Sequence, residues 1–154
     1  MGLTHNLKEI KMKKLLVLLI LIVPLSSFAQ SSLYAGEYEI RFEMKGGELI
    51  ERKLSLNQDG TFLFHIYTNI DPKQPEENKY AKGVWKVEKE NIIYFYADQK
   101  TDIDEGHTLN FNNTKARYHS KSKRDKSARI IEKSLKFYDS NIFWVKSMKL
   151  LKKE

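Results

Sequence analysis

Residues 36–69 read GEYEIRFEMKGGELIERKLSLNQDGTFLFHIYTN, and apolar and polar side chains alternate along much of this stretch. The alternation is clearest over residues 37–44, where Tyr, Ile, Phe and Met take turns with charged side chains. A period of two is typical of a β-strand with one apolar and one solvated face. Lys45-Gly46-Gly47 and Asn57-Gln58-Asp59-Gly60 interrupt the pattern, and glycine-containing turns of this kind favour hairpins. The stretch therefore predicts three antiparallel strands joined by tight turns.

The remainder of the chain continues in short apolar segments separated by polar turns. Residues 61–69 are apolar on both faces, which predicts a strand that is covered on both sides or lines a cavity. The proline-containing residues 71–79 predict an exposed loop. Further strands are expected at residues 83–87 and 92–96, around Leu109, Phe111, Ala116 and Tyr118, at 128–138, and at 142–145 as the closing strand.

One of these segments has two interpretations. Ile131, Leu135 and Phe137 suit a strand, but the apolar residues of 128–138 also fit one face of a helix. The turn Asp139-Ser140-Asn141 favours the strand, and Lys152 and Lys153 are expected to fray beyond the last strand. About eight strands with hairpin-like links predict an all-β, antiparallel meander closed into a lipocalin-like barrel, and a two-sheet β-sandwich is the alternative.

The N-terminal segment predicts export. Lys13 and Lys14 precede an unbroken apolar run over residues 15–23, and Ser27-Phe28-Ala29 places small residues where a signal peptidase cleaves. The stretch from Leu15 to Leu25 contains Pro24 and then turns polar, so it is shorter than the roughly 20 apolar residues that a membrane-spanning helix needs. We therefore expect residues 1–29 to be an N-terminal extension and secretory signal, cleaved near Ala29-Gln30, with either Met1 or Met12 as the start.

The expected mature product, residues 30–154, is then a single secreted or periplasmic β-barrel-like domain without a transmembrane segment. It contains no cysteine, so its stability must come from its core alone. The chain has a formal net charge of +7, and residues 115–129 alone carry +6. Basicity confined to one segment argues against a nucleic-acid-binding protein, which usually builds a basic face from several elements.

Three short motifs resemble those of a known family: Gly36-Glu37-Tyr38, the hairpin of residues 54–62, and Lys82-Gly83-Val84-Trp85. They resemble small lipocalin-like domains of bacterial exported proteins and are similar to the barrel of copper-resistance envelope lipoproteins. The resemblance implies a barrel. That family carries paired cysteines after its first strand and a lipid-bearing N-terminal cysteine, where this chain has Lys45-Gly46-Gly47 and Gln30. Copper binding and lipid attachment are therefore not implied.

The sequence contains no recognisable catalytic or metal-binding motif. His65, His107 and His119 lie on separate segments without the short spacings of a zinc site. The acidic residues in 98–106 do not have the spacing of a calcium loop. There is no Gly-x-Ser-x-Gly motif and no carboxylate pair suited to acid–base catalysis. We therefore expect a protein that is not an enzyme and that uses no metal or cofactor.

Two groups of residues are candidates for binding. The first is the basic segment, whose cations could hold a phosphate or carboxylate group or contact an anionic surface: Lys115, Arg117, Lys121, Lys123, Arg124, Lys126 and Arg129. The second is a set of aromatic side chains expected inside the barrel: Phe62, Phe64, Trp85, Tyr94, Tyr96, Phe111 and Trp144.

These groups support two hypotheses. The first is a non-enzymatic envelope protein that holds a small amphipathic or anionic ligand in the barrel, with the basic segment at its mouth. The second is an interaction module with a filled barrel that docks on an anionic envelope surface or protein through residues 115–129. A cavity in the barrel would favour the first hypothesis, and a packed interior would favour the second.

Overall fold

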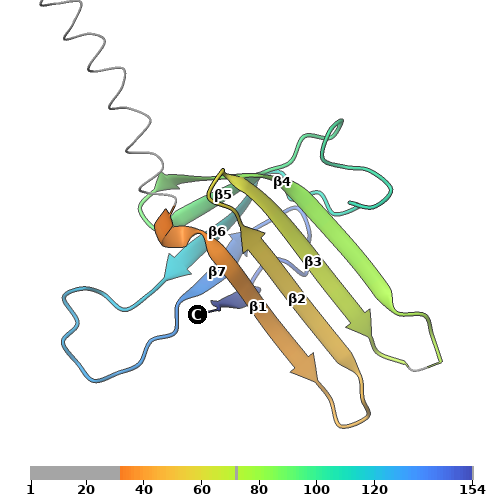
Figure 1. Cartoon of the computed structure of the whole chain (residues 1–154), viewed down its shortest axis with the longest axis horizontal. Helices are drawn as coiled ribbons and strands as arrows, with labels where there is room; N and C mark the ends of the chain where they lie inside the picture. Colours follow the sequence, from red (N-terminus) through yellow and green to blue (C-terminus); the bar gives the residue numbers. More distant parts are fainter. Residues whose placement is uncertain (1–31, 72, 154) are drawn as a thin grey trace, which may run out of the picture.

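The computed structural model describes residues 32–71 and 73–153, which form one closed antiparallel barrel of eight strands in sequential order (Figure 1). The strands are β1 (Gly36–Glu43), β2 (Leu49–Leu56), β3 (Thr61–Asn69), β4 (Glu77–Lys89), β5 (Ile92–Tyr96), β6 (Thr114–His119), β7 (Ser134–Asp139) and β8 (Lys149–Lys152). The all-β meander barrel is therefore confirmed and the sandwich is not. The predicted signal segment and its cleavage site lie outside the described residues.

The first four strands form long, regular hairpins, as their sequence pattern predicts. The β1–β2 register pairs Tyr38 with Leu54 and Phe42 with Ile50, so the apolar faces of the two strands coincide. The β2–β3 turn closes with Gly60 at a φ of +86°, a conformation that glycine adopts without steric cost. The Asp59 carboxylate accepts hydrogen bonds from the backbone and the hydroxyl of Thr61, which fixes this turn.

The barrel has two distinct ends. A short helical turn at residues 32–34 lies at the end where β1 begins, and we call this the capped end. Because the strands alternate in direction, the β6–β7 loop (residues 120–133) lies at the capped end too. The β1–β2 turn and the β3–β4 loop lie at the opposite end, which we call the far end, where the long strands β1 to β4 extend outward (Figure 1).

The predicted closing strand is wrong. Residues 142–145 lie in turns rather than in a strand, and β8 follows at Lys149. Three of its four side chains pack against the core instead, with Val145 fully buried and Ile142 and Trp144 partly buried, whereas Phe143 is 91% exposed. Lys152, expected to fray, belongs to β8, and its ammonium group donates a hydrogen bond to the carbonyl oxygen of Leu33 at 3.1 Å.

Two other strand boundaries also differ from the prediction. β6 begins only at Thr114, so Leu109 and Phe111 precede it in irregular chain, where Phe111 is fully buried. β7 begins at Ser134, and Ile130 before it is 93% exposed. A buried apolar residue packs equally well from a strand and from a loop that folds over a barrel end. An apolar residue such as Phe111 therefore does not show by itself whether it belongs to a strand or to a loop.

Gly83 lets β4 pass close to its neighbours. Its φ is +153°, and a Cβ atom there would lie 2.2 Å from the carbonyl oxygen of Tyr96 and 2.9 Å from the ring of Phe62. Both contacts are far too short, and the first is with backbone that cannot rotate away. We therefore expect Gly83→Ala to lower the free energy of unfolding by roughly 2–4 kcal/mol.

Gly46→Ala is the matched control, because the nearest atoms to a Cβ there are at ordinary van der Waals distance. Urea unfolding followed by tryptophan emission measures both variants. Equal stability of Gly83→Ala and the wild type would contradict the close approach of β4 and β5.

Candidate anion-binding face

The interior of the barrel is packed with aromatic side chains. Phe62, Phe64, Trp85 and Phe111, four of the predicted interior residues, are at most 3% exposed. The ring centroids of Phe64 and Phe111 lie 4.8 Å apart, and those of Phe62 and Phe111 lie 5.8 Å apart. Such distances are those of directly contacting rings. In this region the rings themselves occupy the space that a ligand would need.

The remaining three predicted interior residues lie elsewhere. On β5 the buried side chains are Ile93 and Phe95, so Tyr94 and Tyr96 point to the outer face. Tyr96 donates a hydrogen bond to Glu88, and Tyr94 lies beneath the ammonium group of Lys115, 5.8 Å from its ring centroid. Residues 92–96 are apolar or aromatic on both faces of the strand. The sequence therefore does not show which of their side chains point into the barrel.

Trp144 is partly buried and comes from the turns that precede β8, not from a strand. Its ring lies 6.2 Å from that of Phe64 and 5.4 Å from the guanidinium group of Arg52. It therefore packs across the inner side of the barrel near its far end.

The basic segment of residues 115–129 does not form one cluster of free cations. Lys115 forms an ion pair with Asp139 at 2.8 Å, which raises the pKa of the ammonium group and lowers that of the carboxyl group. Arg129 pairs with Asp125 at 3.6 Å. Lys121 donates a hydrogen bond to the carbonyl oxygen of Ser127. The other four candidates are exposed and, within residues 32–71 and 73–153, form no ion pair: Arg117, Lys123, Arg124 and Lys126.

Arg117 belongs instead to a row of cations that crosses three strands. It lies directly opposite Lys136 on β7, and Lys136 lies directly opposite Lys149 on β8. All three are exposed on the outer face, and none forms an ion pair with any described residue. Neighbouring strands are about 4.8 Å apart, so the row is about 10 Å long. Like charges directly opposite one another destabilise a sheet.

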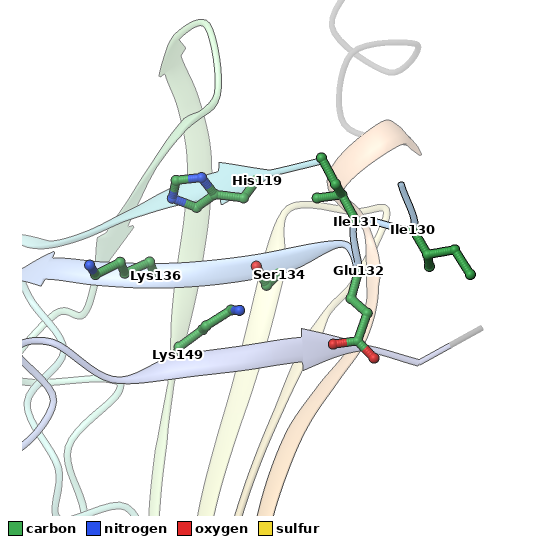
Figure 2. A pocket seen from close by; sticks show the side chains of 7 residues that line it. All are labelled: His119, Ile130, Ile131, Glu132, Ser134, Lys136 and Lys149. Atoms are coloured by element: carbon green, nitrogen blue, oxygen red, sulfur yellow. The ribbon is translucent and has the colours of Figure 1, made fainter. Parts of the chain in front are cut away.

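A groove lies beside two cations of this row, Lys136 and Lys149, and the side chain of Glu132 also lines it (Figure 2). Its volume is about 650 Å³. Lys136, Ser134 and Lys149 form its floor together with His119 at the end of β6, and residues 130–132 of the β6–β7 loop form its wall. Ser134 is only 1% exposed although it lies on the outer face of β7, and it lines the groove together with these loop residues. The cations therefore border a shaped surface rather than a flat one.

The last three strands and their loops differ in charge from the rest of the barrel. Residues 115–154 contain 13 Lys and Arg against 4 Asp and Glu, whereas residues 30–114 contain 10 against 15. Because β6, β7 and β8 are neighbours in the barrel, this basic part of the sequence also forms one side of the barrel. A one-sided field of this kind attracts and orients anionic partners.

Lys136 and Lys149 were missed because they lie outside the basic segment. The sequence does contain a signal for them: on β7 and β8 each alternates with buried apolar residues, which places it on the outer face. Their alignment with Arg117 depends on the strand register. The register of β6 against β7 contains a bulge between Lys115 and Ala116, and the long loop between the two strands does not fix which residues pair. The register therefore could not be predicted from the sequence.

The other polar candidates form local structure. His65 stacks on Tyr80 with ring centroids 4.4 Å apart. Asp104 accepts hydrogen bonds from Lys82 and His107, which hold the pKa of its carboxyl group well below its usual range. Among residues 32–71 and 73–153, no group of three or more His, Cys, Asp or Glu is placed to hold a metal ion. No helix in the same residues is long and apolar enough to cross a membrane.

Comparison with known proteins gives no match: no family model, no curated protein and no solved structure is similar to this chain. The similarity to copper-resistance envelope lipoproteins therefore stays a prediction from the motifs alone.

The packing of the interior generates a mutational prediction. Phe64→Ala should lower the free energy of unfolding by about 3–5 kcal/mol, because it leaves a void in contact with Phe111 and Trp144. Tyr96→Ala, on the outer face, should cost only about 1 kcal/mol. Urea unfolding measures both. Similar small losses at the two positions would mean that the interior is loosely packed around Phe64.

Proposed function

We propose that this chain is a non-enzymatic exported module that docks on an anionic membrane leaflet of the cell envelope through its basic face. We define this basic face as the outer surface of β6, β7 and β8 together with the β6–β7 loop. The row of Arg117, Lys136 and Lys149 carries the proposal, because three aligned cations without ionic partners repel one another in the free protein. Anionic head groups would remove that repulsion.

Two features favour a lipid surface over a soluble polymer or an acidic protein. Ile130 is 93% exposed at the rim of the groove, and Leu33 is 58% exposed at the same end of the barrel. Exposed apolar side chains beside cations are typical of segments that insert shallowly into the head-group region of a bilayer. The packed interior around Phe62, Phe64 and Phe111 supports a role for the barrel as a rigid platform.

The strength of docking can be predicted from the number of cations. Each Lys or Arg close to an anionic leaflet contributes about 1 kcal/mol at physiological ionic strength. Neutralising Arg117, Lys136 and Lys149 together as Gln should therefore weaken binding to vesicles on the order of 100-fold. Folding should be preserved, because the three side chains are exposed and the substitutions remove like-charge repulsion at the loss of one surface contact, that of the Arg117 guanidinium group with the ring of Tyr138 at 5.7 Å.

The measurement is co-sedimentation with vesicles of phosphatidylcholine containing phosphatidylglycerol, over a range of salt concentrations. Lys45, Lys73 and Lys100 changed together to Gln make the control, since they are exposed outside the basic face and give the same change in net charge. We expect salt-sensitive binding that the control retains and the row variant loses. Equal losses in both variants, or equal binding to phosphatidylcholine alone, would refute the proposal. Binding only to a soluble polyanion would refute the choice of a membrane.

A further inference from the structure

One arginine lies on the inner face of the barrel. Arg52 of β2 stands directly between Ile40 of β1 and Ile66 of β3, and it shares its face with Leu54 and Leu56. The period-two pattern of β2 places it there, in a position that the neighbouring strands fill with apolar side chains. A charged residue on an apolar inner face costs solvation free energy unless a partner compensates for it.

Arg52 has no such partner among the described residues. Its Nε atom is buried and has no hydrogen-bond partner, and no carboxylate forms an ion pair with its guanidinium group. The guanidinium group lies over the ring of Trp144, whose centroid is 5.4 Å away. Arg41, on the outer face of the neighbouring strand, shows the ordinary alternative, since it pairs with both Glu43 and Glu51.

The inner face around Arg52 is apolar and becomes accessible toward the far end. Ile40, Ile50 and Ile66 are only partly buried, and Phe42, which pairs with Ile50, is 47% exposed. These residues belong to the long strands that extend past the packed part of the barrel (Figure 1). An unpaired cation thus sits between the aromatic core and an open apolar strip formed by Ile40, Phe42, Ile50 and Ile66.

We propose that Arg52 and this apolar strip bind a single-chain amphipathic anion with a carboxylate head group. A carboxylate matches the fork of N–H donors on a guanidinium group and would supply the hydrogen-bond acceptor that Nε lacks. The alkyl chain would lie on the apolar strip and cover side chains that are otherwise exposed to solvent. The site is at the far end, and the basic face is on another side with its loop at the capped end, so the two are independent.

The melting temperature of Arg52→Met distinguishes a purely structural role of Arg52 from a role in ligand binding. If Arg52 serves only to stack on Trp144, Arg52→Met should lower the melting temperature. If Arg52 is retained for a ligand, Arg52→Met removes an uncompensated charge from an apolar face, and the melting temperature should stay equal or rise. Arg41→Met is the matched control for binding, since Arg41 is on the outer face of the same hairpin.

The experiment is a titration of the full domain with decanoate below its micelle concentration, followed by calorimetry and by tryptophan emission. We expect saturable binding at one site, a change in emission that Trp144→Phe abolishes, and affinity at least tenfold weaker for decanol than for decanoate. Arg52→Met should weaken decanoate binding at least 30-fold, whereas Arg41→Met should change it less than twofold. Absence of saturable binding by the wild type would overturn the proposal. Equal affinity for decanol, or unchanged binding by Arg52→Met, would overturn it too.

Discussion

The structure depends on the closure of the barrel between its first and last strands. This seam is short: Tyr38 pairs with Lys152 and Glu39 with Leu151, and no other pairs join β1 to β8 in the described chain. The backbone N–H of Lys153 adds a hydrogen bond to the carbonyl oxygen of Glu37 at 2.8 Å. Without the seam, β1 and β8 would both be open edges, and the aromatic interior would be exposed to water.

Side chains at the capped end reinforce this short seam. The ammonium group of Lys152 lies over the ring of Tyr38 at 5.6 Å and donates a hydrogen bond to Leu33, while the Tyr38 hydroxyl donates one to the carbonyl oxygen of Tyr34. Burial raises the pKa of Tyr38 and keeps its hydroxyl a donor. The helical turn, β1 and β8 are thus fixed to one another, which positions the basic face relative to the rest of the barrel.

The fold could be predicted from the sequence because each strand of the first half carries its own period-two pattern and its own turn signal. Tyr94 and Tyr96 could not be placed, since Ile92–Tyr96 is apolar in both phases. The closing strand was misplaced because residues 142–145 resemble a buried strand yet pack from turns. Only part of the candidate surface could be predicted. The sequence shows the basic segment, but the alignment of Arg117 with Lys136 and Lys149 depends on the registers of β6 against β7 and of β7 against β8.

Lys136→Gln tests most directly whether the cation row is strained in the free protein, because Lys136 has a like charge on either side. Urea unfolding at low and high salt gives the free energy of unfolding of this variant and of the wild type. At low salt the variant should be more stable by about 0.5–1 kcal/mol, and the difference should vanish at about 1 M salt, where charges are screened beyond about 3 Å. A variant less stable than the wild type at low salt would show that Lys136 stabilises the barrel. The row would then hold no repulsion for an anionic partner to relieve, which would contradict the account.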